Sequence, residues 1–286
     1  MNAATSSLAA QEALLEQRFP QALPTLPSGA RVAVREHGRR GTGASLVLLH
    51  GISSGAASWL QAVLALPQDL HVVAWDAPGY GDSSALADST PRAAGYAQRL
   101  AELLQALDLR RVVLAGHSLG ALMACACAAR HPDLIERLVL ISPARGYGAS
   151  AEEGARVRRE RGEALRTQGV AGLAARIDQR LLSPQATEAA RAWVRWNAER
   201  LHPAGYLQAV EMLANSELAP VTAPVEVHCG EADVVTPPAS CEQAARALRA
   251  GFATIARAGH ASPVEQPEAV AALLLAAVQK KGMSRE

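Results

Sequence analysis

A single serine stands between two glycines in the stretch VVLAGHSLGA, residues 112–121. An apolar, β-branched run precedes this turn and a run of small residues follows it, which predicts a strand, a tight turn and a helix. A serine in Gly-x-Ser-x-Gly at such a turn adopts a strained backbone conformation that lifts its Oγ above the sheet. Gly116 and Gly120 lack the Cβ atoms that would clash where helix and strand cross. The pattern therefore predicts Ser118 as a nucleophile.

A serine hydroxyl needs a base that takes its proton and an acid that orients the base. Among the eight histidines, His260 lies in a glycine-flanked loop, AGHASP, directly after the last predicted strand. Asp233, in GEADVVTPP, follows the preceding predicted strand, and Glu231 is its nearby competitor. The interval between the two loops leaves room for one helix and one strand, so both loops are expected at the same sheet edge. This order predicts a triad of Ser118, Asp233 and His260.

Attack on an acyl group also creates an oxyanion, which fixed backbone N–H groups stabilise without reorganisation. The amide of Leu119 begins the predicted helix after the nucleophile, where the helix dipole favours negative charge. The loop after an early strand, in LLHGISSGAASW, supplies a second donor. We expect the amide of Ile52 in this role, with that of Ser53 as the alternative.

The elements that must position these groups alternate between strands and helices. Seven short and mostly continuous apolar runs predict buried strands, with helical stretches between several of them. The strands are expected at 31–37, 46–50, 71–76, 111–116, 137–142, 225–230 and 252–257, and the helices at 92–107, 119–130, 238–250 and 264–280. The alternation predicts an α/β fold with a parallel sheet covered by helices.

The strand pattern stops between residues 144 and 219, where the chain reads as helical throughout. A helical insertion between two strands predicts a cap over the carboxyl edge of the sheet, where open α/β sheets bind their ligands. The predicted domains are a core of residues 1–143 and 220–286 and a helical cap of residues 144–219.

Composition argues against several classes of function. The 286 residues carry a formal net charge of +1, without the basic domain or stripe of a nucleic-acid-binding protein. No apolar run approaches the roughly 18 residues of a membrane span, and the amino terminus lacks the features of a signal peptide. The four cysteines form no CxxC pair, which indicates free thiols rather than disulfides or a metal site. We expect a cytoplasmic protein with no membrane or nucleic-acid partner.

Five stretches in chain order resemble motifs of the α/β-hydrolase fold family: LLHGISSG, AWDAPGYGDS, AGHSLG, CGEADVVTPP and AGHASPVEQPE. The resemblance implies an eight-stranded, mostly parallel sheet flanked by helices, with a helical cap inserted after the sixth strand. It also implies the triad of Ser118, Asp233 and His260, and no cofactor. GEADVVTPP, GHASPVEQPEAV and PAGYLQAVEML are similar to the 3-oxoadipate enol-lactonases, whereas HGISSGAASW is similar to the meta-cleavage product hydrolases.

These residues predict a serine hydrolase that cleaves an ester or lactone of a small organic acid through an acyl-enzyme. One alternative is a hydrolase of C–C bonds in vinylogous diketone acids, which would use the same triad. The other is a non-catalytic binding protein, because a fold does not determine a function. The expected partner is a small-molecule ester, lactone or diketone, no metal is expected, and a homodimer stays an open alternative.

Six further residues are candidates for substrate binding because they lie near the mouth of the site or in the cap. They are Ser53, Trp59, Arg145, Trp193, Trp196 and Tyr206. The arginine follows a strand at the entrance to the cap and is expected to hold a substrate carboxylate, with a surface or hinge role as its alternative. Packing of helices against one another is the alternative role for the cap aromatics.

Overall fold

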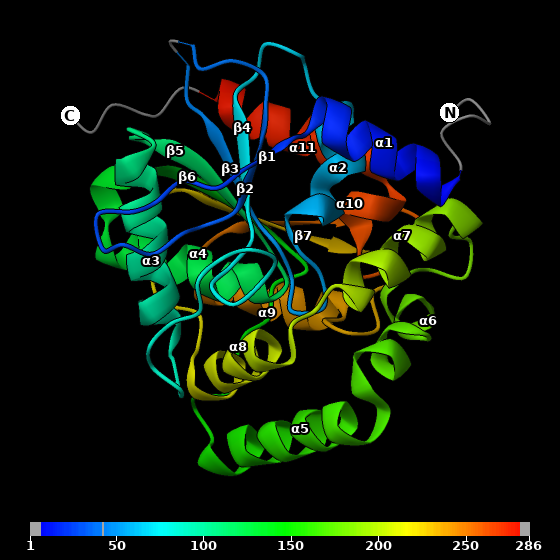
Figure 1. The fold of residues 1–286 in the computed structure, drawn as a ribbon. Helices are drawn as coiled ribbons and strands as arrows, with labels where there is room; N and C mark the ends of the chain where they lie inside the picture. Colours follow the sequence, from blue (N-terminus) through cyan, green and yellow to red (C-terminus); the bar gives the residue numbers. More distant parts are fainter. Residues whose placement is uncertain (1–6, 42, 281–286) are drawn as a thin grey trace.

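The computed structural model describes residues 7–41 and 43–280, which fold around an eight-stranded sheet (Figure 1). The strands are β1 (Gln21–Ala22), β2 (Val34–His37), β3 (Leu46–Leu49), β4 (Val72–Trp75), β5 (Val112–His117), β6 (Ile135–Ile141), β7 (Val225–Gly230) and β8 (Gly251–Ile255). They lie in the order β1-β2-β4-β3-β5-β6-β7-β8. β2 pairs antiparallel with β1 and with β4, whereas all neighbours from β4 to β8 run parallel. The predicted, mostly parallel sheet is confirmed, and the short β1 adds an edge that the sequence did not indicate.

Helices cover both faces of the sheet, which explains why its central strands are continuous apolar runs. One face carries α3 (Ala93–Ala106), α4 (Leu119–Arg130) and α9 (Pro238–Ala247). The other face carries α1 (Leu8–Arg18), α2 (Leu60–Leu64) and α11 (Pro267–Gln279) (Figure 1). All residues of β3, β4 and β5 are buried between these two helical layers.

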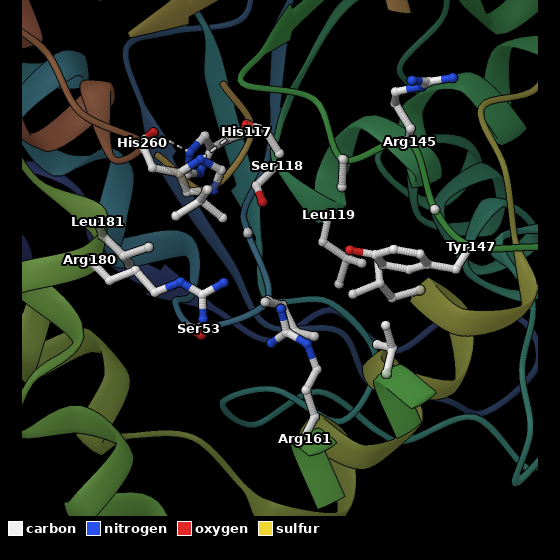
Figure 2. A pocket seen from close by; sticks show the side chains of 18 of the residues that line it. Ser53, His117, Ser118, Leu119, Arg145, Tyr147, Arg161, Arg180, Leu181 and His260 are labelled. Carbon is white, nitrogen blue, oxygen red and sulfur yellow. Dashed lines mark hydrogen bonds between the residues drawn. The ribbon is translucent and has the colours of Figure 1, made fainter. Parts of the chain in front are cut away.

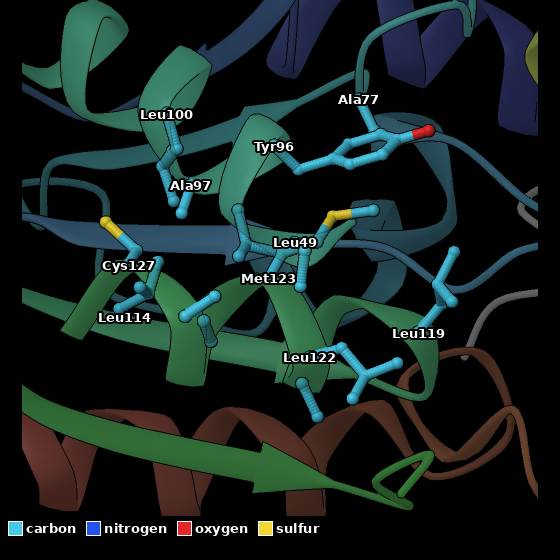
Figure 3. Close-up of a cluster of buried hydrophobic side chains, with 14 of the residues drawn as sticks. Leu49, Ala77, Tyr96, Ala97, Leu100, Leu114, Leu119, Leu122, Met123 and Cys127 are labelled. Atoms are coloured by element: carbon cyan, nitrogen blue, oxygen red, sulfur yellow. The ribbon is translucent and has the colours of Figure 1, made fainter. Parts of the chain in front are cut away.

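Alternate residues of a strand enter the two apolar clusters in turn, as the pleat requires. On β3, Leu49 belongs to the cluster under α3 and α4, whereas Leu48 belongs to the cluster on the opposite face. Figure 3 shows the first cluster, in which Leu49 and Leu114 face Leu100 of α3 and Met123 of α4. This packing fixes the carboxyl ends of β3 and β5 relative to each other.

The segment between β6 and β7 contains four helices within the predicted cap range. They are α5 (Ala151–Ala174), α6 (Ile177–Leu181), α7 (Glu188–Glu199) and α8 (Pro203–Asn215). α5 is broken at Gly169, whose φ of 64° is readily adopted by glycine. In Figure 1, α5, α6 and α8 lie beyond one end of the sheet, while α7 lies beside α10 (Ser262–Glu265) and α1.

The two chain segments that lead into and out of these helices pair with each other. Gly146 and Glu217 form an isolated antiparallel bridge, and the Leu218 N–H donates to the Arg145 carbonyl at 3.2 Å. The Tyr147 N–H donates to the Leu213 carbonyl at 3.0 Å. The inserted helices therefore leave and rejoin the core at a short two-stranded stem.

The expected helix at 264–280 is interrupted by Pro267. This proline has no N–H to continue the hydrogen-bond ladder, so α10 ends at Glu265 and α11 begins at Pro267. The short 3-10 helices η2 (Ala56–Trp59) and η3 (Pro132–Leu134) complete the connections. A search of the helices in the described part of the chain finds none that is long and apolar enough to cross a membrane.

Candidate active site

Ser118 lies in the turn between β5 and α4 and has a strained backbone. Its φ of 52° and ψ of −115° place it in a region that non-glycine residues rarely occupy, at a cost of about 1–3 kcal/mol. Hydrogen bonds hold this conformation: the Ser118 N–H donates to the Ile141 carbonyl at 2.9 Å, and its own carbonyl accepts from Ala144 at 3.0 Å. The side chain is directed into a pocket at the carboxyl edge of the sheet (Figure 2).

The flanking glycines permit a close crossing of helix and strand. A Cβ on Gly116 would stand 2.6 Å from the Gly120 carbonyl oxygen, and a Cβ on Gly120 would stand 2.4 Å from that of Leu49. Real Cβ atoms do not approach backbone atoms this closely. The two glycines are therefore required by geometry at the turn that presents Ser118.

Asp233 and His260 meet on neighbouring loops after β7 and β8. The His260 Nδ1 donates to the Asp233 Oδ2 at 2.8 Å, and both side chains are almost fully buried. Because Nδ1 is committed to the carboxylate, Nε2 is the ring nitrogen left to exchange a proton. His260 also lines the pocket that contains Ser118. The competitor Glu231 is exposed and accepts from the Arg257 N–H instead.

Thr236 completes the surroundings of the Asp233 carboxylate. Its N–H donates to Oδ1 at 2.9 Å, its hydroxyl lies 3.0 Å from Oδ2, and the Val235 N–H donates to Oδ1 at 2.8 Å. Burial opposes ionisation of Asp233, but the hydrogen bond and charge of His260 outweigh it, with help from the Thr236 N–H. Together they lower the pKa of Asp233 to about 2. The carboxylate therefore stays charged and able to orient His260.

The loop after β3 is anchored from two sides. His50 is buried, its Nδ1 donates to the Gly51 carbonyl at 2.8 Å, and its Nε2 accepts from the Ala77 N–H at 3.0 Å. The Tyr80 hydroxyl donates to the Ile52 carbonyl at 2.8 Å. Burial lowers the pKa of His50, which keeps this ring neutral. These bonds fix the loop that carries the Ile52 amide.

The residues of both predicted oxyanion donors, Ile52 and Leu119, line the same pocket as Ser118. Leu119 is the first residue of α4, and the first N–H groups of a helix have no acceptor within it. A Cβ on Gly51 would stand 3.2 Å from the Ser118 Cβ, so the loop after β3 packs directly against the nucleophile. The two amides belong to two elements that meet at Ser118.

His117, beside the nucleophile, is a buried neutral donor. Its Nε2 lies 2.8 Å from the His260 carbonyl, which can only accept, so Nε2 carries the proton. Burial, followed by the positive charge of His260, lowers the pKa of His117 to about 3. A group with so low a proton affinity is unsuited to take the proton of Ser118. His117 instead supports the backbone of His260.

The pocket has a volume of about 840 Å³ and extends from the sheet edge to α5, α6 and α8. Of the residues expected to bind substrate, Ser53, Arg145 and Tyr206 line it. The Arg145 guanidinium, however, points away from Ser118 (Figure 2) and donates to Gln243 at 2.7 Å. The structure therefore directs the charge of this arginine toward α9 rather than toward the nucleophile.

The three tryptophans lie outside the pocket lining and pack inside the protein. Trp59 is fully buried, with its ring edge against His117 at a centroid distance of 6.3 Å. Trp193 is also fully buried and donates to the Ala57 carbonyl at 3.2 Å. Trp196 stacks on Trp193 at 4.4 Å, with Arg200 over its ring. The packing role holds for these residues, because their rings are buried against the body of the protein and none of them lines the pocket.

Glu265 links the loop of His260 to the inserted helices. Its carboxylate accepts from the Gly259 N–H at 2.7 Å and from the Ser183 N–H at 3.1 Å. The Ala261 N–H donates to the Leu181 carbonyl at 2.8 Å. Sequence reasoning missed Glu265 because nothing near it in the chain shows that the end of α6 lies opposite. Thr236 was missed as well, although it stands inside the quoted motif CGEADVVTPP.

Within the described residues, no group of three or more histidine, cysteine, aspartate or glutamate side chains is arranged to hold a metal ion. The four cysteines are buried and free.

Comparison with known proteins adds an independent line of evidence. Residues 46–273 match the model of the alpha/beta hydrolase family. The chain is 27% identical over 194 residues to (E)-2-((N-methylformamido)methylene)succinate hydrolase of Acinetobacter baylyi, covering 66% of this chain and 70% of that protein. It spans 30% of the length of uncharacterised mycobacterial relatives, to which it is 38% identical over 106 residues.

Solved structures agree with this match. A thermophilic esterase from Thermogutta terrifontis superposes with a TM-score of 0.80 at 25% identity, covering 92% of this chain and 99% of that one. The enol-lactonase from Burkholderia xenovorans superposes with a TM-score of 0.78 at 24% identity, covering 91% and 100%. The second likeness concerns the fold alone.

Proposed function

The chain belongs to the alpha/beta hydrolase family, and from this premise we propose that it hydrolyses a carboxylic ester or lactone of a small organic acid. Ser118 is the nucleophile, His260 the general base and acid, and Asp233 the residue that orients His260. The observation that carries the proposal is the 2.8 Å bond between the His260 Nδ1 and the Asp233 Oδ2, beside a pocket shared with Ser118.

In the first half of the reaction, the Ser118 Oγ attacks the carbonyl carbon while the His260 Nε2 takes the hydroxyl proton. The carbonyl electron pair moves to oxygen, and the N–H groups of Ile52 and Leu119 stabilise this oxyanion. Removing one such donor typically raises the activation barrier by about 3–4 kcal/mol. The intermediate then collapses: the C–O bond breaks, the leaving oxygen takes the proton from His260, and the acyl group stays on Ser118.

In the second half, His260 takes a proton from water as the water oxygen attacks the acyl carbon. Collapse of the second intermediate releases the acid and returns the proton to the Ser118 Oγ. Asp233 stays ionised throughout and stabilises the imidazolium that forms twice in the cycle. A lactone follows the same course, with its ring oxygen as the leaving group.

The test is hydrolysis of p-nitrophenyl butyrate together with labelling by a fluorophosphonate probe. Ser118→Ala is expected to lower kcat by about 10⁴–10⁶-fold and to abolish labelling. Ser89→Ala, which removes an exposed serine outside the pocket lining, serves as the control and keeps both. Labelling of a residue other than Ser118, or full activity of Ser118→Ala, contradicts the mechanism. A wild-type chain that neither hydrolyses esters nor reacts with the probe favours the binding-protein alternative.

A further inference from the structure

Two arginines of the inserted helices reach into the pocket without a carboxylate partner. Arg161 on α5 and Arg180 on α6 both line it, and Figure 2 shows their guanidinium groups directed toward the space before Ser118. Arg161 donates to the Tyr206 hydroxyl at 3.2 Å. Within residues 7–41 and 43–280, neither arginine forms an ion pair with a carboxylate.

Three other arginines of α5 form ion pairs with nearby carboxylates, and a fourth, Arg159, is exposed to solvent. Arg156 pairs with Glu160 at 3.1 Å, Arg158 with Glu211 at 3.1 Å, and Arg166 with Glu163 in the same helix. An arginine is normally placed against a carboxylate, as these three are, or against solvent. Arg161 is half-buried and Arg180 is exposed, but both guanidinium groups are directed into the pocket, where a ligand can reach them.

The charges at the pocket wall leave a positive excess on the side of these two arginines. Three carboxylates also line the pocket. Glu160 is held by Arg156, while Glu153 and Glu217 are exposed near the stem of the inserted helices. Ile52, Leu181 and Leu213 add apolar side chains to the lining, alongside the hydroxyl groups of Ser53 and Ser54. The charges of two guanidinium groups favour an anion in this pocket.

We propose that Arg161 and Arg180 bind a carboxylate of the substrate, so that the ester or lactone cleaved at Ser118 carries a negative charge at its far end. This inference rests on the proposed hydrolase function and names its substrate class. A planar guanidinium fork matches a carboxylate with two parallel N–H···O bonds. Arg145 does not share this role, because its guanidinium points away from Ser118 and toward Gln243 of α9.

The test compares two substrates of equal shape that differ in charge. Mono-p-nitrophenyl glutarate carries a terminal carboxylate, and p-nitrophenyl 5-methylhexanoate carries an isopropyl group in its place. For the alcohol side of the ester, 4-acetoxybenzoate and 4-isopropylphenyl acetate form the equivalent pair. We expect the wild type to prefer the charged member of at least one pair by about 10- to 100-fold in kcat/KM.

The variants Arg161→Met and Arg180→Met retain apolar stems but lose the guanidinium. Each is expected to reduce the charged-to-neutral ratio of kcat/KM by about 10-fold or more, chiefly through KM. Arg176→Met, which removes an exposed arginine outside the pocket lining, is the matched control and keeps the ratio. A ratio that survives both pocket variants, or that falls equally in Arg145→Met, overturns the inference.

A binding measurement separates this inference from the proposed reaction. Glutarate is titrated calorimetrically into Ser118→Ala and into Ser118→Ala combined with Arg161→Met. Tighter binding to the first by about 10-fold or more supports the anion site even if no ester is hydrolysed, in which case the proposed function alone fails. If neutral esters are hydrolysed through Ser118 but neither charged substrate nor glutarate is favoured, the function stands and the inference is wrong.

Discussion

Replacing Glu265 by alanine is expected to destabilise the protein and to loosen the loop of His260, the proposed base. The carboxylate accepts from the Gly259 N–H at 2.7 Å and from the Ser183 N–H at 3.1 Å, on two segments that are far apart in the chain. Gly259 precedes His260, and Ser183 follows the end of α6. Without the carboxylate, two buried N–H groups lose their acceptor.

The magnitude follows from the burial of these donors. Gly259 is buried and Ser183 is only 1% exposed, so solvent does not readily replace the carboxylate. An unsatisfied buried donor costs about 1–3 kcal/mol, which gives a loss of about 2–6 kcal/mol for the two. For a chain of this size that loss lowers Tm by about 4–12 °C. Glu265→Gln, which keeps one carbonyl oxygen, is expected to lose less than half of this.

The assay combines thermal unfolding with steady-state hydrolysis of p-nitrophenyl butyrate. Because the released loop carries His260, kcat is expected to fall in Glu265→Ala while KM changes little. Glu268→Ala, an exposed carboxylate in the first turn of α11, is the control and shifts stability by less than about 1 kcal/mol. A Tm within 1 °C of wild type in Glu265→Ala, or an equal shift in Glu268→Ala, refutes the reasoning.

Three further outcomes are expected. In urea unfolding, Gly120→Ala is expected to destabilise the protein by about 1–3 kcal/mol or more, because its Cβ would stand 2.4 Å from a backbone carbonyl. Gly162→Ala, whose Cβ would have nothing within 4 Å, is expected to stabilise its helix by about 0.5–1 kcal/mol. Shifts of the same sign in the two variants contradict this. The pKa of Asp233, about 2 against an ordinary 3.8, adds stability above pH 4 that is lost as pH falls toward 2, at up to about 1.4 kcal/mol per pH unit. Asp233→Asn is therefore expected to make the free energy of unfolding, followed by circular dichroism, depend less on pH between pH 4 and pH 2. An unchanged pH dependence contradicts this expectation. Tyr80→Phe frees the loop of Ile52 and lowers kcat on p-nitrophenyl butyrate by about 5- to 10-fold, and unaltered kinetics would show that this bond is dispensable.

Much of the sheet was predictable because its strands are apolar on both faces. The run at 225–230 coincides with β7, and that at 111–116 differs from β5 by one residue at each end. β1 escaped prediction because two exposed residues carry no periodic pattern. The prediction of one helix at 264–280 did not take Pro267 into account, although a proline within a helical pattern indicates a boundary.

The candidate site likewise contains residues that local sequence predicts and residues whose position depends on tertiary packing. Ser118, Asp233 and His260 each follow a strand directly, so local sequence and the parallel topology were enough to bring their loops to one edge. The pocket wall depends on how inserted helices pack, which no local pattern records. Trp193 therefore turned out to be packed on the core, while Arg161 and Arg180, in a charged helical segment, were not among the predicted site residues.

The two-stranded stem at Gly146 and Glu217 has a consequence for how such a protein diversifies. Because the inserted helices leave and rejoin the core at adjacent points, the sheet tolerates their replacement as it would tolerate a longer hairpin. The residues proposed to select the substrate and those proposed to cleave the bond therefore lie largely on separable parts of the chain. Among the contacts that cross this boundary, one lies next to His260: a transplanted insertion needs a backbone N–H where Ser183 now meets Glu265. Recombination that ignores this contact would yield folded chains with a poorly held base.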